Sequence, residues 1–192
     1  MEDSRRRGRR TLLLLAAIFL LPVAASFALY YGKIWRPAGS SSKGELITPA
    51  RPLDVAGLRN PDGSAASPGA LRDKWSLIYI GDGACDAACR SALVFGRQTR
   101  LALNNEMSRV QRVFLATGNC CANDYFAKEQ PGLVALDASA AQRLLAQFPA
   151  DRGHSLYIVD PLGNLMMRYP RDADPSRIKK DVTRLLKVSG IG

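Results

Sequence analysis

Histidine and cysteine are scarce in this 192-residue chain, which contains a single histidine, His154, and four cysteines. A metal site built from several imidazoles is therefore excluded, and any metal site must use other ligand types. The cysteines form no CxxC pair, so the common spacing of a redox dithiol is absent. Basic residues are not clustered with aromatic ones, so the net charge of +10 gives no support for nucleic-acid binding.

The positive charge is concentrated near the N-terminus. The segment 1–43 contains 8 basic and 2 acidic residues, a net charge of +6. The rest of the chain contains 19 basic and 15 acidic residues, a net charge of +4. Residues 11–31 carry no charge, and about 20 apolar residues allow a helix to cross a bilayer. A cleaved signal peptide with its cleavage site at Ser26–Ala28 is the alternative, but that site would lie inside the apolar stretch. We therefore expect an uncleaved anchor.

The flanking charges predict the orientation of this anchor. Five arginines precede the apolar run, against Lys33 and Arg36 just after it, and the positive-inside rule then keeps the N-terminus in the cytoplasm. We expect a single-pass protein of the inner (cytoplasmic) membrane with four parts, namely a basic cytoplasmic tail (1–10), a transmembrane anchor (11–32), a linker rich in Ser, Gly and Pro (33–53) and a soluble periplasmic domain (54–192). In that oxidising compartment a cysteine pair is a disulfide, a maintained redox couple or a metal site.

Strand and helix patterns alternate in the soluble domain. Short apolar runs predict strands at 74–82, 110–118 and 132–139, followed by a hairpin over 155–170. Helices are predicted at 84–107, 139–149 and 174–190. This order predicts an α/β fold in which a mixed sheet is flanked by helices.

The predicted helices differ in how regular their apolar faces are. The helix over 84–107 has an imperfect face, interrupted by Thr99 and formed by Ala88, Ala92, Phe95 and Leu103. The closing helix begins at Asp174, precedes Gly190, and has a regular stripe formed by Ile178, Val182, Leu185 and Leu186.

Two cysteines, Cys85 and Cys89, follow the first buried strand with a three-residue spacer. If the helix begins near residue 84, both sulfurs project from one face of its first turns, where the helix N-terminus favours thiolate. Thiolates suit Cu(I) and zinc, and the spacer also allows a disulfide to close. In an exported domain such a pair is most often a structural disulfide, so CxxxC alone does not decide among these roles.

Three further residues bear on a copper site. His154 offers the imidazole that a two-thiolate copper site lacks, and it lies at the entrance to a predicted strand rather than on an apolar face. Met166 and Met167 fall on the second strand of the hairpin. Thioethers are Cu(I) ligands, although at least one of these two side chains is expected to pack in the core.

The other two cysteines, Cys120 and Cys121, are adjacent in the segment GNCCAND after the second strand. Adjacent thiols rarely bond to each other without strain. They are therefore interpreted as bystanders, as partners for Cys85 or Cys89, or as extra metal ligands.

A strand, a CxxxC at a helix start and the downstream segment HSLYIVDPLGNL resemble the Sco/SenC family of membrane-anchored, thioredoxin-like copper proteins. The resembling region extends from about Leu71 to Leu186. The resemblance implies a thioredoxin-like fold and a role in assembling the CuA site of cytochrome c oxidase. It also implies copper as the bound metal, Cys85, Cys89 and His154 as its ligands, and the copper subunit of the oxidase or other assembly factors as partners.

The chain departs from the family pattern near its cysteines. The family usually has threonine two residues before the first cysteine and proline after each cysteine, whereas here these positions hold Gly83, Asp86 and Arg90. The interval between the second cysteine and His154 is shorter than the family pattern leads one to expect, and the GNCCAND pair is additional. The chain therefore resembles a divergent member.

Three functions fit these features. The leading hypothesis is an anchored assembly factor, or metallochaperone, that delivers copper to the oxidase or reduces the thiols of its copper site. The enzyme alternative is an extracytoplasmic thiol–disulfide oxidoreductase, in which only Cys85 and Cys89 act. The third is a non-catalytic docking protein that uses the same cysteines as a structural disulfide.

Overall fold

The structure is a computed structural model that describes residues 2–31, 44–121, 124–149, 156–170 and 173–192. It divides into two compact units, Met1–Ser41 and Ser42–Gly192. The first contains helix α1 (Glu2–Tyr31), within which the stretch Arg6–Ala28 is long and apolar enough to cross a membrane. Pro22 lies inside this helix, which is tolerated in membrane-spanning helices.

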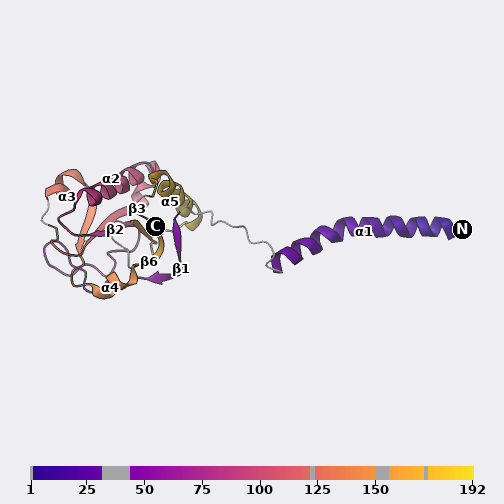
Figure 1. Cartoon of the computed structure of the whole chain (residues 1–192), viewed down its shortest axis with the longest axis horizontal. Coiled ribbons are helices and arrows are strands. Elements are labelled where there is room, and N and C mark those ends of the chain that lie inside the picture. The colour runs from indigo at the N-terminus through magenta and orange to yellow at the C-terminus, as the bar shows by residue number, and fades with distance from the viewer. Residues whose placement is uncertain (1, 32–43, 122–123, 150–155, 171–172) are drawn as a thin grey trace. The chain divides into compact units, whose positions relative to one another are not determined.

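The second unit is built on one six-stranded sheet with the strand order β1-β6-β5-β2-β3-β4 (Figure 1). Strands β2, β3 and β4 pair in parallel, whereas β1, β6 and β5 join the sheet through antiparallel pairs. The bounds of the strands are β1 (Glu45–Pro52), β2 (Trp75–Gly81), β3 (Val110–Ala116), β4 (Leu133–Asp137), β5 (Leu156–Val159) and β6 (Asn164–Tyr169). The predicted mixed sheet is confirmed.

Helices cover both faces of this sheet. They are α2 (Ala87–Leu101), the 3-10 helix η1 (Asn104–Arg109), α3 (Asp124–Glu129), α4 (Gln142–Gln147) and α5 (Pro175–Ser189). Alternate residues of β2 serve the two faces, since Ile78 packs in one cluster with Leu144 of α4 and Tyr79 packs in another with Leu93 of α2. Figure 1 shows α4 on the opposite side of the sheet from α2 and α5.

The edge strand β1 corrects the predicted linker over 33–53. Glu45–Pro52 forms a strand antiparallel to β6, although almost all of its residues are exposed. The strand is also held at its start, where the backbone N–H of Gly44 donates to a buried carboxylate oxygen of Asp181 at 2.9 Å. The hydroxyl of Tyr169 donates to the same oxygen at 2.8 Å, and burial together with this carboxylate raises the pKa of Tyr169.

The helix predicted over 84–107 is shorter than expected, and its buried face is a different one. The helix α2 spans Ala87–Leu101 and buries Cys89, Leu93, Gly96 and Thr99. Thr99 is therefore part of the core face rather than an interruption of it, while Phe95 is 42% exposed. The predicted face was wrong because it gave weight to Ala and Phe and overlooked a stripe made of Cys, Leu and Gly.

The closing helix agrees with its prediction. Asp174 caps the N-terminus of α5 by accepting from the backbone N–H of Ser176, and Gly190 ends it in a left-handed conformation with φ +58°. Ile178, Val182 and Leu186 are buried against the sheet. Met167 is also buried in this cluster, as expected for one of the two methionines, and Met166 packs against it.

Candidate functional site

The four cysteines lie in two loops that leave the same end of two neighbouring parallel strands. Gly81 of β2 and Ala116 of β3 are the last pair in the register of these strands. Cys85 follows Gly81 by four positions, and Cys120 follows Ala116 by four positions. Since parallel strands end at one edge of a sheet, the two loops emerge side by side.

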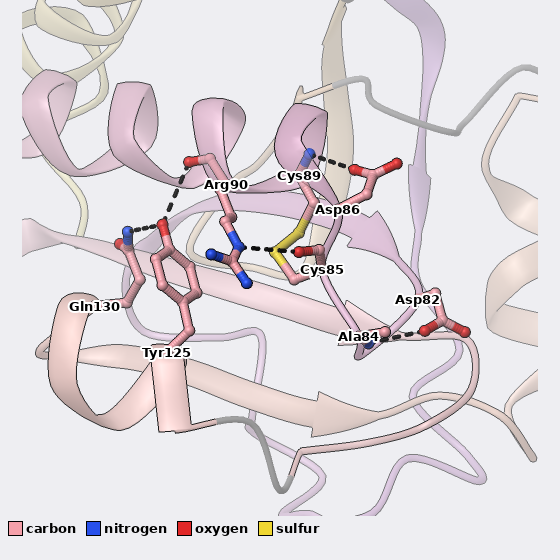
Figure 2. Close-up of a disulfide and its surroundings, with 8 residues drawn as sticks. All are labelled: Asp82, Ala84, Cys85, Asp86, Cys89, Arg90, Tyr125 and Gln130. Carbon is pink, nitrogen blue, oxygen red and sulfur yellow. Dashed lines mark hydrogen bonds between the residues drawn. A yellow bond between two sulfur atoms is a disulfide. The ribbon is translucent and has the colours of Figure 1, made fainter.

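Cys85 and Cys89 form a disulfide, with their Cα atoms 5.1 Å apart (Figure 2). The prediction that both lie on the first turns of one helix is wrong. Cys85 precedes the helix in a left-handed conformation with φ +49°, Asp86 is the N-cap, and only Cys89 is within α2. The helix starts later because the Asp86 carboxylate accepts from the backbone N–H of Cys89 at 2.8 Å.

The Cys85–Cys89 disulfide is shielded from bulk solvent but borders an open hollow. Each cysteine is 2% exposed. A cavity of about 330 Å³ reaches both, and its lining comprises Tyr79, Ile80, Gly81, Asp82, Ala84, Cys85, Asp86 and Cys89. A side chain of a partner can therefore approach the sulfurs through this cavity, whereas a large surface cannot contact them directly.

Charged groups are placed around the disulfide. The Asp82 carboxylate accepts from the backbone N–H of Ala84 at 2.8 Å and from the side-chain amide of Asn119. These hydrogen bonds, that of Ala84 above all, lower the pKa of Asp82. The guanidinium of Arg90 lies on the other side, where Figure 2 shows it beside Cys85.

Arg90 is held in place by its neighbours. Its Nε donates to the carbonyl oxygen of Cys85 at 3.2 Å, and its guanidinium lies 4.9 Å from the ring centroid of Tyr125. Gln130 in turn donates to the Tyr125 hydroxyl at 2.8 Å. Asp86 and Arg90 occupy the positions where the Sco/SenC pattern has proline, and each has a structural role here. Asp86 caps α2, and Arg90 is a cation held beside the disulfide.

The other pair, Cys120 and Cys121, is also joined by a disulfide, so the structure describes no free cysteine among the residues it covers. Both side chains are half-buried and pack against the cluster that contains Cys85 and Cys89. The roles predicted for this pair did not include a bond between its own two sulfurs, which is what the structure shows.

His154, the predicted third copper ligand, lies outside the described residues. Within the described part of the chain, no group of three or more His, Cys, Asp or Glu side chains is arranged to hold a metal ion. The donors that the structure does bring together are the sulfurs of Cys85 and Cys89, which as thiolates are soft ligands of the kind that suits Cu(I).

Comparison with protein families identifies the chain. Residues 75–189, which include both disulfides and the whole sheet except β1, match the model of the transmembrane-like, thioredoxin-like C-terminal domain. The chain belongs to this transmembrane-like, thioredoxin-like family. The N-terminal domain of the transmembrane-like type matches residues 2–33, in agreement with the apolar helix α1. No curated protein matches the chain.

Solved structures show that this family member has the fold of Sco proteins. Apo Sco1 from Thermus thermophilus has a TM-score of 0.63 and 22% identity, over 78% of this chain and 99% of that one. Yeast Sco1 with copper bound has a TM-score of 0.56 and 18% identity, over 78% of this chain and 96% of that one. BsSco, a member of the Sco family of cytochrome c oxidase assembly proteins in which a disulfide switch was identified, has a TM-score of 0.56 and 18% identity, over 75% of this chain and 99% of that one. The expected resemblance to a divergent Sco protein is confirmed, and identities this low establish a likeness of fold.

Sequence reasoning missed the residues that join the two cysteine loops. Asp82 and Asn119 were not singled out, although each lies within a few positions of a cysteine and both are polar residues in turn-rich loops. The signal that would have revealed them is the equal spacing from strand end to cysteine in GDGAC and ATGNC, because it predicts that these segments meet at one sheet edge.

Proposed function

We propose that this protein is a membrane-anchored, Sco-like assembly factor that keeps the copper-site thiols of cytochrome c oxidase reduced. Cys85 and Cys89 are its working pair. The observation that carries the proposal is the disulfide between them, which borders a cavity and lies at the start of α2. A disulfide in that position is accessible to one partner side chain and protected from the solvent around it.

The reaction is a dithiol–disulfide exchange. A dithiol first reduces Cys85–Cys89 and becomes a disulfide itself. One thiolate of the reduced pair then attacks a sulfur of the target disulfide and forms a mixed disulfide, and one target thiolate leaves and takes up a proton. The second cysteine attacks its partner in the mixed disulfide, which restores Cys85–Cys89 and releases the second target thiol. Two electrons pass from the donor to the target.

The groups around the pair favour the attacking thiolate. Cys89 is the third residue of α2, where backbone N–H groups and the helix dipole stabilise a negative sulfur. Arg90 adds a positive charge beside Cys85. The role proposed for the two cysteines thus has a physical basis in their surroundings.

The membrane arrangement follows from the charges that flank α1. We propose that residues 1–10 are cytoplasmic, that 11–32 span the inner membrane, and that the unit built on the sheet, with β1 as its first strand, forms the periplasmic domain. Cysteine-free variants with a single new cysteine at Ser4 or Ser64 test this orientation in intact cells. A membrane-impermeant maleimide should label the variant Ser64→Cys alone, and labelling of Ser4→Cys alone would reverse the topology.

Copper delivery is the second candidate, because the thiolates of Cys85 and Cys89 suit Cu(I) and a Sco1 structure of this fold has copper bound. In this function copper is the cargo. Cys85 and Cys89 would hold the ion with His154, and reduction of the disulfide would have to precede loading. The same two cysteines serve both candidates, whereas His154 serves only this one.

One experiment separates the candidates. The full chain is purified in detergent, reduced, and mixed with an oxidised peptide that spans the copper-site cysteines of the oxidase subunit. We expect the peptide disulfide to be reduced, and Cys85→Ser or Cys89→Ser to abolish the reaction, whereas His154→Ala should retain it. Peptide reduction that persists in both serine variants would overturn the proposal.

A Cu(I) titration against a competing chelator completes this comparison. Copper delivery predicts binding of one ion that is weakened in His154→Ala and in both serine variants. If neither peptide reduction nor copper binding depends on the cysteines, and a Cys85→Ser/Cys89→Ser strain still assembles the oxidase, the docking alternative holds.

A further inference from the structure

We propose that Cys120 and Cys121 are a second redox pair, which exchanges electrons with Cys85 and Cys89 inside the same domain. The inference rests on the proposed dithiol function of Cys85 and Cys89 and adds an internal relay to it. In this relay, an external protein dithiol reacts first with Cys120–Cys121.

The backbone holds the two cysteine loops against each other. The N–H of Gly83 donates to the carbonyl oxygen of Gly118 at 2.9 Å, and the N–H of Thr117 donates to the carbonyl oxygen of Gly81 at 2.9 Å. The approach is so close that a Cβ on Gly83 would collide with the carbonyl oxygen of Asn119. These hydrogen bonds fix the start of both loops, two to four residues before the first cysteine of each.

Side chains reinforce this contact. The amide of Asn119 donates to both carboxylate oxygens of Asp82, at 3.2 Å and 3.0 Å. The backbone of Asn119, which directly precedes Cys120, is in a left-handed conformation with φ +46°. The same carboxylate accepts from Ala84, which directly precedes Cys85. Asp82 therefore links the residue before one disulfide to the residue before the other.

The two cysteine pairs differ in exposure, and from this difference we infer the order in which they react. Cys85 and Cys89 are each 2% exposed, whereas Cys120 and Cys121 are half-buried and lie on the outside of the shared apolar cluster. A protein dithiol presents its sulfur from a folded surface, so it reaches the outer pair more readily than the inner one. The inner pair remains open to a single side chain through its cavity.

The exchange conserves atoms and electrons. An external protein dithiol reduces Cys120–Cys121 and leaves as a disulfide. A thiolate of the outer pair then attacks a sulfur of Cys85–Cys89, which forms one disulfide between the loops and frees one inner thiolate, and that thiolate takes up a proton. The remaining outer thiolate attacks the sulfur of its neighbour, which restores Cys120–Cys121 and releases the second inner thiol. The outer pair is regenerated, and two electrons have moved inward.

A trapping experiment tests the central step. Trypsin cleavage after Lys74, Arg90, Arg112 and Lys128 places the inner pair in residues 75–90 and the outer pair in residues 113–128. Four double serine variants of the full chain, each with one inner and one outer cysteine, are purified in detergent and oxidised. We expect mass spectrometry to find these two peptides joined by a disulfide within one chain in at least one variant. Two free thiols, or only links between chains, in all four variants would overturn the relay.

A rate measurement tests the proposed order. Reduced thioredoxin serves as the protein dithiol, and alkylation followed by digestion reports each pair separately. We expect reduction of Cys85–Cys89 to be about tenfold slower in Cys120→Ser/Cys121→Ser, because exchange within a domain has a high effective concentration. The matched variant Cys85→Ser/Cys89→Ser should reduce its outer pair at the rate of the unmodified chain. Equal rates for the inner pair with and without the outer cysteines would refute the order.

These outcomes are independent of the proposed target. If the loops exchange electrons but the oxidised copper-site peptide is not reduced, the relay stands and the proposed target is wrong. If the peptide is reduced equally well without Cys120 and Cys121 and no link between the loops forms, the target stands and the relay is wrong.

Discussion

The carboxylate of Asp86 accepts a hydrogen bond from the backbone N–H of Cys89 at 2.8 Å, and this bond sets where α2 begins. It leaves Cys85 outside the helix and Cys89 in its first turn. The two sulfurs thus belong to different kinds of backbone, one to a loop and one to a helix. Only Cys89 therefore lies where the N–H groups of the helix N-terminus can stabilise a thiolate.

The first prediction concerns this cap. Asp86→Ala should lower the free energy of unfolding of the full chain by about 1 kcal/mol, the usual cost of losing a helix N-cap. Asp86→Ser, which can still cap the helix, is the matched control and should lose much less. Chemical denaturation in detergent, followed by tryptophan fluorescence, measures both, and equal losses in the two variants would show that the cap is not the cause.

The second prediction concerns the contact between the cysteine loops. Gly83→Ala places a methyl group against the backbone of Asn119 and should cost about 1–3 kcal/mol of unfolding free energy. Gly69→Ala is the control, because the nearest atom to its new Cβ is the Ser67 hydroxyl oxygen at 3.7 Å. If Gly83→Ala is as stable as Gly69→Ala, the loops are not in contact in solution.

The third prediction is a dependence on pH. The backbone N–H of Ala84 and the amide of Asn119 hold the pKa of Asp82 below its ordinary value of 3.8. A carboxylate with a lowered folded-state pKa stabilises the fold above the ordinary value, and this stabilisation is lost as the pH falls through the lowered value. The amide NMR signal of Ala84 should therefore shift with a midpoint below pH 3.8.

The Asp82→Asn variant provides the control for this titration. Its Ala84 amide should show no such transition, because the side chain at position 82 no longer ionises. A midpoint at or above the ordinary aspartate value in the unmodified chain would mean that the hydrogen bonds of Asp82 do not persist in solution.

Buried strands were predictable from the sequence, whereas the exposed edge strand was not. In β2, six of the seven residues are buried, so a continuous apolar run marked the strand. In β1 only Ile47 is even partly buried, and the strand is held by backbone pairing with β6 and by the buried carboxylate of Asp181. Both of these partners are more than 100 positions away in the sequence. No local pattern carries that information.

The sequence was sufficient to select Cys85 and Cys89 as candidate site residues but not to predict their geometry. The spacing of Cys85 and Cys89 after a buried strand was sufficient to select them, and the fold places them at the end of that strand. The predicted start of α2 is too early because it leaves out the capping preference of Asp86. The disulfide between Cys120 and Cys121 was not expected, because adjacent thiols rarely bond to each other without strain.

The fourth prediction concerns Arg90, whose Nε donates to the carbonyl oxygen of Cys85 at 3.2 Å. A fixed guanidinium beside a thiol favours the thiolate, which is the form that reacts with alkylating agents. After reduction of the full chain, Arg90→Gln should slow alkylation of Cys85 and Cys89 by iodoacetamide at pH 7. The decrease should be about fivefold, which corresponds to about 1 kcal/mol of lost electrostatic stabilisation.

Arg97→Gln is the matched control for this charge effect. Arg97 is on the same helix, but its side chain donates to the carbonyl oxygen of Glu129 at 3.1 Å, away from the disulfide. Because the two substitutions change the net charge equally, a general effect of charge would slow both variants alike. Slower alkylation in Arg90→Gln alone would locate the effect at the Cys85 loop. Equal rates in both variants would mean that Arg90 holds the loop and Tyr125 together without activating the thiols.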